Sequence, residues 1–340
     1  MPDSAPLDAP LLADLRPGDS FFNATWRISL AEHRAYKNRD AGFFVVCTVA
    51  DNTGSHEVRC FDKPPLALEE LHSATFVRCD GKVATGSFHG QISLEKVQII
   101  AAPADLSRFE MPVQGDFKAH QARFGDLIRS VRNPHFHALL KEIFRRDGEI
   151  WPCFEGAPAA TNMHHNYRGG LLEHCGEVAL LCERLAGALP HLDRDLLITA
   201  ALLHDIGKIE EMECDFSSGK IQYTHAGHLV GHIVLGSCLV ASAAEKIEGF
   251  PTRLKHELMH LILSHHGEPE YGAAKRPMCA EALILSQCDN LSAKIAQCAG
   301  KLEGEGDFAS TGQNGWHSLP HAPQRTLYVG KMREMREESS

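Results

Sequence analysis

Imidazole and carboxylate side chains recur between residues 174 and 289 in a pattern that suits a metal site. They are His174, the adjacent pair His204-Asp205, His232, the doublet His265-His266 and Asp289. When separate helices deliver such ligands, they form a pocket for a divalent cation, which polarises a phosphate and lowers the pKa of a bound water. The leading hypothesis from these residues is therefore phosphoester hydrolysis.

Helical periodicity explains why these ligands should converge. The apolar run 196–203 ends in His204-Asp205, an ionisable pair that would be costly to bury without a metal or a partner. Asp289 is likewise a lone acid within a mostly apolar helical run, and apolar residues recur at helical spacing around His174. Lys208 follows the pair by one turn. We expect its ammonium group to contact a substrate phosphate or a developing charge.

A second motif, His256-Glu257-Leu258-Met259-His260, matches the His-Glu-x-x-His helix of zinc proteases. At about 100° per residue, His265 falls roughly opposite His256 on a continuous helix, so one pocket does not use both sets. Because the His265-His266 doublet belongs to the larger constellation, the protease interpretation is disfavoured. We expect His256 to face solvent.

Composition limits the class of protein. The chain has 340 residues and 44% hydrophobic content, enough for two or three domains with packed cores. Residues 1–15 lack the pattern of a secretory signal, no apolar run approaches a membrane span, and the eleven cysteines are scattered, which favours reduced thiols in a cytoplasmic protein. The net charge of −10 argues against broad coating of duplex nucleic acid but does not exclude a nucleic-acid substrate.

The first domain is predicted to be a small β-barrel over residues 20–102, preceded by an extension over 1–19. Short alternating segments separated by turn signals, notably 51–54 and 79–81, predict about five strands that resemble an oligonucleotide-binding (OB) fold. Arg34, Lys37 and Arg39 form a basic loop that is the better candidate contact for single-stranded nucleic acid. Phe61 is a candidate for base stacking, although most such aromatics fill a barrel interior.

The second domain is predicted to be all-α over residues 118–300. Apolar residues spaced by three and four begin near Phe124 and continue to about Cys298, without strand-like alternation of comparable length. Residues 103–117 carry prolines and no clear period, so they are interpreted as a linker packed on or between domains. The glycine-rich residues 301–340 are expected to form an irregular C-terminal tail.

These residues carry a family resemblance. The arrangement of His174, His204-Asp205 and Asp289 resembles the HD-domain metal-dependent phosphohydrolases, which are all-α. The stretches 164–174, 201–208, 231–233 and 262–267, together with the barrel, resemble the YhaM-type 3'-to-5' exoribonucleases, which join an OB fold to an HD domain.

The resemblance implies roles for individual residues. His174, His204, Asp205 and Asp289 would hold a first metal, His232 and the His265-His266 doublet a second metal or a phosphate, and Asp205 would bridge the two ions. Asp205 and Lys208 are the expected catalytic residues, and Arg168, within the first stretch, is an expected nucleic-acid contact. Two divalent ions are expected, with manganese favoured and iron, cobalt or magnesium as alternatives.

The resemblance further implies hydrolysis of single-stranded RNA from its 3' end, with single-stranded DNA as a further substrate. Two other functions stay open from the sequence. One is a phosphohydrolase of a mononucleotide or signalling nucleotide, which would use the same metal site. The other is a non-enzymatic single-strand-binding protein, against which the intact ligand set argues. No membrane partner is expected, and a barrel plus a helical domain could assemble into a homo-oligomer.

Overall fold

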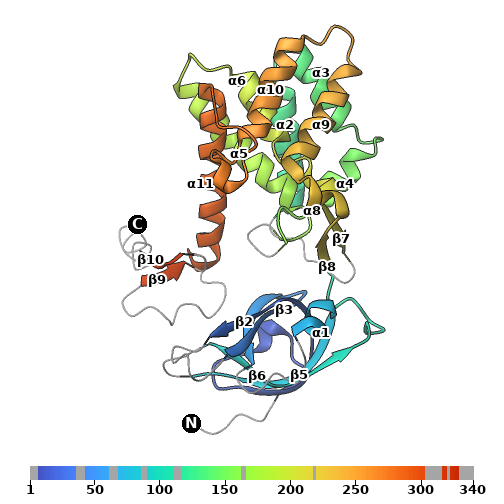
Figure 1. Ribbon diagram of the computed structural model, residues 1–340, viewed down its shortest axis with the longest axis vertical. Helices are drawn as coiled ribbons and strands as arrows, with labels where there is room; N and C mark the ends of the chain where they lie inside the picture. Colours follow the sequence, from blue (N-terminus) through green and yellow to red (C-terminus); the bar gives the residue numbers. More distant parts are fainter. Residues whose placement is uncertain are drawn as a thin grey trace. The chain divides into compact units, whose positions relative to one another are not determined.

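The structure, a computed structural model, describes residues 7–35, 43–60, 68–85, 90–110, 116–161, 166–216, 220–302, 316–319 and 322–328. The chain divides into two compact units, one centred on residues 1–112 and the other on residues 113–214 and 221–296. Figure 1 shows strands in the first unit and mainly helices in the second. Within the described ranges, every helix is too short or too polar to span a bilayer.

The first unit is a closed barrel. Its strands are β1 (Leu7–Asp8), β2 (Ser20–Ala35), β3 (Phe43–Asp51), β4 (Gly54–Cys60), β5 (Phe76–Val83) and β6 (Ile92–Ile100), with helix α1 (Leu68–Ser73) between β4 and β5. The sheet order is β1-β2-β3-β4-β6-β5, and a further pairing of β2 with β5 closes it into a five-stranded barrel. All neighbours are antiparallel except β1–β2 and β4–β6. The predicted OB-like barrel is therefore confirmed.

Alternation along the strands builds the barrel core. Val45, Cys47 and Val49 on β3 are almost fully buried and pack with apolar residues from every other strand of the closed barrel. The turn predicted at 51–54 joins β3 to β4, with Asp51 opposite Gly54. The turn predicted at 79–81 is wrong, because these residues lie within β5, where the pairing with β6 shifts register between Asp80 and Gly81. An added Cβ at Gly81 would lie 2.3 Å from the Ser93 carbonyl oxygen of β6, so only glycine allows this close approach.

The segments that flank the barrel belong to its core. A 3₁₀ turn, η1 (Leu12–Asp14), follows β1, and Leu12 and Leu15 join the barrel core. On the other side, Phe109 is 2% exposed and packs edge-on against Phe76, with ring centroids 5.0 Å apart. Residues interpreted from the sequence as extension and linker thus add apolar side chains to the barrel.

The second unit is a helical bundle. Its main helices are α2 (Phe117–Ser130), α3 (Pro134–Ile143), α4 (Ile150–Gly156), α5 (Gly170–Ala188), α6 (Arg194–Leu203), α9 (His232–Glu245), α10 (Thr252–Ser264) and α11 (Ala280–Leu302). Three shorter helical segments are α7 (Lys208–Glu211), α8 (His225–Leu229) and the 3₁₀ turn η4 (Pro269–Tyr271).

Local signals explain where these helices begin. Asp116, Asn133 and Asp193 cap α2, α3 and α6, because each side chain accepts a hydrogen bond from a backbone N–H in the first turn. Every residue of α6 from Leu196 to Leu203 is buried, which makes it a central helix of the bundle. The residues at the end of α6 are therefore delivered into the interior.

Two small sheets depart from the expectation drawn from the sequence. Within the otherwise helical second unit, β7 (Met212–Asp215) pairs with β8 (Lys220–Tyr223). In the region expected to be an irregular tail, β9 (Trp316–Leu319) pairs antiparallel with β10 (Ala322–Tyr328). The four-residue strands β7, β8 and β9 hold too few residues for alternation to stand out. The seven residues of β10 do not alternate between apolar and polar types.

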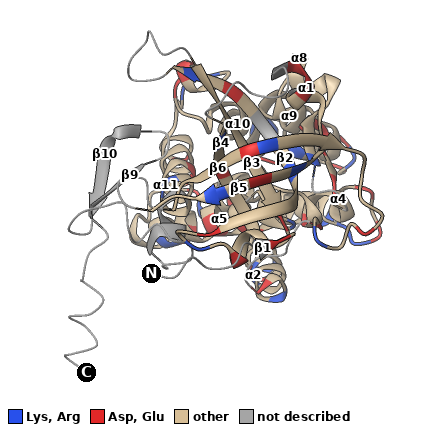
Figure 2. Ribbon diagram, turned by 90° about the horizontal axis from the view of Figure 1, so that it is seen from below, with Lys and Arg blue, Asp and Glu red and all other residues tan. Residues whose placement is uncertain are grey.

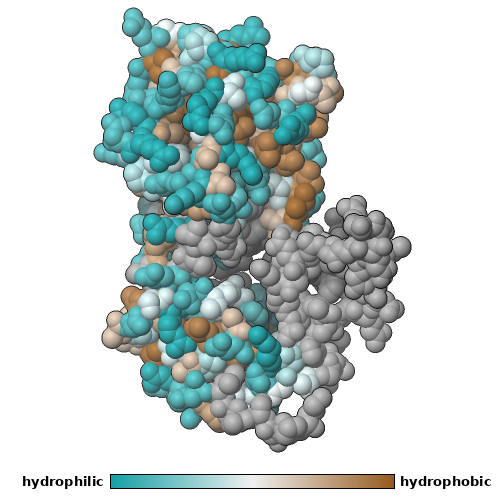
Figure 3. All heavy atoms as spheres, turned by 180° about the vertical axis from the view of Figure 1, so that it is seen from behind, coloured by the Kyte–Doolittle hydropathy of each residue, from teal (hydrophilic) through white to brown (hydrophobic). Residues whose placement is uncertain are grey.

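The outer surface of the bundle is mixed. Figure 3 shows one face on which hydrophilic residues predominate, with apolar residues gathered in patches over the helices. On α11, Leu283, Leu291 and Ile295 are about half exposed. Its opposite side packs into the core through Ala282, Leu285 and Cys288.

Candidate metal centre

Five helices deliver the side chains predicted to bind metal. His174 lies within α5, and Asp289 lies within α11. The other ligands lie at helix ends: His204 caps α6 and precedes Asp205, His232 begins α9, and His265 caps α10 and precedes His266. Lys208 begins α7, one turn after Asp205. The structure therefore brings together all the predicted metal ligands and Lys208.

A first cluster consists of His174, His204 and Asp289, whose ligand atoms lie close enough to share one cation. The Nε2 atoms of His174 and His204 are 3.3 Å apart. Asp289 Oδ1 lies 3.1 Å from His174 Nε2 and 3.8 Å from His204 Nε2. Both histidines are buried, so these nitrogens face one another within the bundle rather than bulk solvent.

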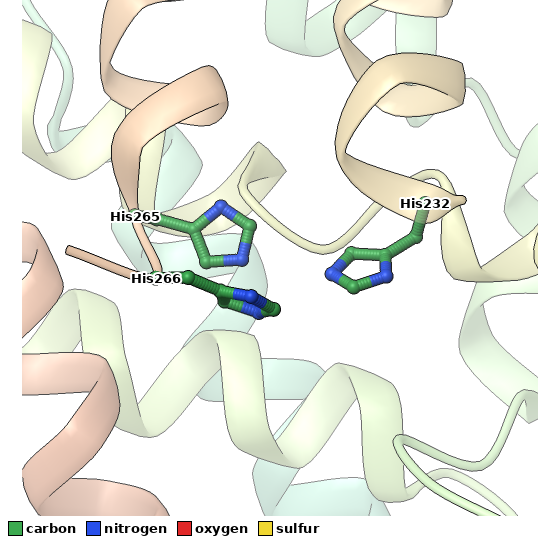
Figure 4. Close-up of side chains that lie close together, drawn as sticks. All are labelled: His232, His265 and His266. Carbon is green, nitrogen blue, oxygen red and sulfur yellow. The ribbon is translucent and has the colours of Figure 1, made fainter. Parts of the chain in front are cut away.

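A second cluster consists of His232, His265 and His266. Figure 4 shows the ring of His232, from the start of α9, facing the two rings at the end of α10. The ring centroid of His232 lies 5.7 Å from that of His265 and 5.2 Å from that of His266. Three imidazoles that face one another in this way form a nitrogen-rich site that suits a transition metal such as iron or zinc, and the carboxylate of Asp205 adds oxygen ligands.

Asp205 lies between the two clusters and directs one carboxylate oxygen to each. Its Oδ2 is 3.5 Å from His174 Nε2 and 3.4 Å from His204 Nε2. Its Oδ1 is 3.4 Å from His232 Nε2 and 3.6 Å from His265 Nε2. This placement suits a carboxylate that bridges two cations.

Each of the five histidines has its Nδ1 atom occupied by an acceptor, which leaves Nε2 directed into the centre. The Nδ1 partners are the carbonyl oxygens of Ala201 for His204, Ile262 for His265 and Tyr271 for His266, the Glu211 carboxylate for His232, and the Ser292 hydroxyl for His174. Such contacts fix the tautomer and the ring orientation of metal-binding histidines. The rings are therefore set for ligation through Nε2.

Three polar atoms in the centre are placed to bind a cation. Asp205 Oδ1, His232 Nε2 and His265 Nε2 are buried and make no hydrogen bond to any residue that the structure describes. A buried polar atom without a partner costs about 1–3 kcal/mol. Because all three belong to the two clusters, a bound divalent cation would satisfy them together, and the donor set fits that group.

Electrostatics favour the ligating forms of most of these groups. Burial alone would raise the pKa of Asp205, but Lys208 and His204 outweigh it and hold that pKa well below its ordinary value. Burial lowers the pKa of His266 to about 4 and also lowers the pKa of His265. Neutral imidazoles and an ionised carboxylate are the forms that bind metal. For His204, burial is outweighed by Asp205, so its pKa is raised.

The short turn between Asp205 and Lys208 requires glycine at position 207. A Cβ there would lie 2.1 Å from the backbone oxygen of His232 and 2.5 Å from the amide nitrogen of Gly236. This close approach brings the start of α9 against the turn that carries Asp205. Lys208 Nζ then lies 2.7 Å from Asp205 Oδ2.

Comparison with known proteins agrees with this geometry. Residues 171–294 match the HD domain family. A 3'-5' exoribonuclease YhaM from Bacillus pumilus is 30% identical over 254 residues, which cover 74% of this chain and 79% of the relative. The chain belongs to the YhaM family. A second YhaM, from Bacillus licheniformis, is 39% identical over 168 residues, about half of each chain. No solved structure matches.

Membership of the YhaM family confirms the resemblance drawn from the sequence, and with it the assignment as a metal-dependent hydrolase with an HD domain. The ligand clusters described above show side chains able to hold metal.

The His-Glu-x-x-His motif takes no part in the centre. His256 is exposed, as expected, and His260 Nε2 accepts a hydrogen bond from the Met278 amide. Glu257 forms an exposed ion pair with Arg253. Among the described residues, neither histidine joins a group with metal-binding geometry.

The structure describes two of the predicted nucleic-acid contacts, Arg34 and Arg168. Arg34, at the end of β2, forms ion pairs with Glu32 at 2.7 Å and Glu57 at 3.0 Å. Figure 2 shows acidic as well as basic residues on the barrel strands. Arg168 is exposed just before α5, which carries His174. The remaining predicted contacts, Lys37, Arg39 and Phe61, lie outside the described residues.

Two supporting residues escaped the sequence analysis. Glu211 Oε1 accepts hydrogen bonds from both Nδ1 and the amide nitrogen of His232, each at 2.9 Å. Ser292 accepts from His174 Nδ1 and donates to Glu177. In the sequence, Glu211 is recognisable only as an acid about one turn after Lys208. The adjacent Glu210 fits the same description, so the sequence does not tell the two apart.

Proposed function

We propose that this YhaM-family protein is a metal-dependent 3'-5' exoribonuclease that degrades single-stranded RNA, and single-stranded DNA as a further substrate. The observation that carries the proposal is the position of Asp205, with one oxygen toward each histidine cluster. The names of the relatives supply the direction and the polymer. The proposed division assigns catalysis to residues 118–300 and substrate guidance to residues 20–102.

Two divalent ions fit the donor set. His174, His204, Asp205 and Asp289 would hold the first, and His232, His265 and His266 with Asp205 the second. Manganese is the proposed ion, since the mixed nitrogen and oxygen ligands suit it, with iron, cobalt and magnesium as the ions to compare. When bound, such ions polarise a phosphoryl oxygen and generate a nucleophilic hydroxide near neutral pH.

Lys208 supplies a fixed positive charge beside the centre. Its side chain is 16% exposed, and although burial would lower its pKa, Asp205 raises that pKa above its ordinary value. The ammonium group therefore stays charged and lies next to the carboxylate that would share the ions. From this position it would bind a phosphate oxygen and stabilise charge that develops during hydrolysis.

The single-stranded substrate would be guided by the barrel mainly through Lys37, Arg39 and Phe61, with a small contribution from the ion-paired Arg34, and by Arg168 at the start of α5. OB folds bind single strands by combining cationic grooves with aromatic surfaces. A homo-oligomer and a cytoplasmic location complete the proposal. The mass of the assembly in solution, measured by light scattering, tests the first of these.

A phosphohydrolase of mononucleotides or signalling nucleotides is the second candidate, because the same centre would serve it. The closed barrel joined to the HD domain favours a polymeric substrate, since a mononucleotide needs no second binding unit. The purely binding function is disfavoured because the chain belongs to an enzyme family and keeps its ligand set.

A metal-dependent time course on labelled single-stranded RNA tests the proposal. With Mn²⁺, a 3' label should appear at once in mononucleotides, whereas a 5' label should pass through a ladder of shortening products. Asp205→Ala is the inactive control. Immediate release of a 5'-labelled mononucleotide would reverse the direction, and turnover of mononucleotides with RNA left intact would favour the second candidate.

A further inference from the structure

The segment 267–279, named here the α10–α11 loop, joins two elements that carry metal ligands. It begins directly after His266 and leads into α11, which holds Asp289. The carbonyl oxygen of Tyr271 in this loop accepts the hydrogen bond from His266 Nδ1, at 2.9 Å. The loop is thus tied to the second histidine cluster through its own backbone.

Backbone contacts hold the loop in one conformation. The amides of Tyr271 and Gly272 donate to the carbonyl oxygens of Glu268 and Pro269, each at 2.9 Å. Further along, the Lys275 amide donates to the Leu263 carbonyl of α10 at 3.2 Å, and Ala273 is 6% exposed. Surface groups on a loop fixed in this way are preorganised for binding, which lowers the entropy cost of contact.

Two large side chains nevertheless point away from the protein. Tyr271 is 75% exposed and Met278 is 73% exposed. Neither side chain fills the core, so packing of the described residues does not explain why this rigid loop presents them. The Tyr271 carbonyl contacts His266 on its Nδ1 side, so this exposed tyrosine lies directly behind a predicted metal ligand, at the rim of the centre.

A shallow hollow of about 510 Å³, largely open to solvent, lies on the same loop, lined by Pro269, Ala274, Lys275, Arg276 and Met278. Its lining contains two cations and neither of the loop's acids. Glu268 pairs with Arg276 at 2.8 Å. Lys275 has no ion-pair partner among the residues that the structure describes. Pro269 lines the hollow and Tyr271 follows it by two residues in the turn η4, so one short turn carries both the edge of the hollow and the exposed ring.

We propose that the α10–α11 loop binds the single-stranded substrate beside the metal centre, with a base stacked on Tyr271 and a backbone phosphate held in the hollow by Lys275. This inference rests on the proposed function, because it concerns the strand that would present its end to that centre. Aromatic rings that stack bases, set next to cations that meet phosphates, are the groups by which proteins hold single strands without reading sequence.

Binding to an inactive protein tests the loop separately from hydrolysis. In the full-length Asp205→Ala background, fluorescence anisotropy with a labelled single-stranded RNA should show about tenfold weaker binding for Tyr271→Ala. Tyr271→Phe keeps the ring and should bind as the parent does. Tyr223→Ala, which removes an exposed tyrosine of β8, is the matched control and should also bind normally. Unchanged binding by Tyr271→Ala, or an equal loss in Tyr223→Ala, overturns the proposal.

Salt dependence tests Lys275. Lys275→Gln should weaken RNA binding and reduce the slope of log affinity against log salt by about 0.7, as expected for one lost phosphate contact on a single strand. Lys275→Arg should restore the slope. An unchanged slope in Lys275→Gln would show that Lys275 holds no phosphate in the hollow.

Kinetics separate this inference from the proposed function. In the otherwise wild-type protein, Tyr271→Ala should raise KM for single-stranded RNA about tenfold and change kcat less than about twofold, because stacking holds the ground state and the transition state alike. A fall in kcat with unchanged KM overturns the stacking role. If the wild-type protein fails to degrade RNA, the proposed function fails, while the anisotropy experiment still decides the loop.

Discussion

The barrel and the helical bundle each bury an aspartate, and the two are treated differently. Asp51 and Asp205 are both 2% exposed. In the barrel, Asp51 Oδ2 accepts from the Leu12 amide at 2.7 Å, and Oδ1 accepts from the Thr53 amide at 2.8 Å. In the bundle, Asp205 Oδ2 meets Lys208, while Oδ1 is buried without a hydrogen bond to a described residue.

This difference separates a structural acid from a functional one. Both carboxylate oxygens of Asp51 accept hydrogen bonds from backbone amides, one in η1 and one in the β3–β4 turn, so no further ligand is needed to satisfy them. The carboxylate of Asp205 is left incomplete by the protein and is surrounded by imidazole nitrogens directed toward it. Burial alone therefore does not identify a site; at Asp205, an unsatisfied carboxylate oxygen surrounded by imidazole nitrogens does.

The largest loss of activity is expected on substitution of Asp205, the acid with an unsatisfied oxygen. Asp205→Ala removes the oxygens shared by both clusters, so hydrolysis of single-stranded RNA should fall by at least about 10²–10³-fold. The far-ultraviolet circular dichroism should stay that of the folded protein. Chelation by EDTA should reproduce the loss in the wild-type protein, with recovery on adding Mn²⁺. Near-normal turnover by Asp205→Ala would reject the bridging role.

A smaller effect, on metal affinity, is expected at Glu211, which contacts the predicted ligand His232. Glu211→Gln weakens the acceptor that orients His232, so metal affinity measured by chelator competition should fall about 10–100-fold. Glu210→Gln is the matched control, since its side chain is exposed on the same short helix α7. Equal affinities in the two variants would show that Glu211 does not support the centre.

The complementary change in the barrel should affect stability alone. Asp51→Ala leaves the amides of Leu12 and Thr53 without their acceptor, which should lower the free energy of unfolding by about 1–3 kcal/mol. Urea unfolding followed by fluorescence measures this change. The metal content of the purified protein should equal that of the wild type. Loss of metal in Asp51→Ala would show that Asp51 also supports the metal centre and is not purely structural.

The smallest effect is expected at Arg34. Because Glu32 and Glu57 neutralise it, Arg34→Gln should weaken RNA binding by less than about twofold, in line with the small free energy of exposed ion pairs. The double variant Glu32→Gln/Glu57→Gln should instead strengthen binding by freeing the cation. Arg253→Gln, on α10, is the exposed control. A large loss in Arg34→Gln would show that the arginine leaves its acids to contact RNA.

Strongly periodic segments predicted most of the fold, and the polar residues that interrupt or end those segments predicted the metal ligands. His204-Asp205 was recognisable because it ends a wholly apolar helix, and Asp289 because it interrupts another. The barrel was recognisable from its turns, such as 51–54. Contacts between distant segments were not predictable: no pattern indicated that Leu12 would join the barrel core, or that Phe109 would pack on Phe76.

Support around the ligands was equally hidden. Glu211 and Glu210 are adjacent acids, and only the fold turns one inward to His232. Arg34 is neutralised in part by Glu57, which lies on another strand. The sequence of the basic loop does not show this pairing, so it overstates the positive charge that Arg34 offers to a ligand. Such pairings depend on strand register, which composition does not reveal.

The order of the ligands along the chain has a consequence for biosynthesis. Asp289 lies on α11, which follows every other ligand-bearing helix in the chain. A nascent chain that has already emerged through α10 therefore lacks one acid of the first cluster. The metal centre is therefore completed only after α11 has been synthesised and has packed against the earlier helices.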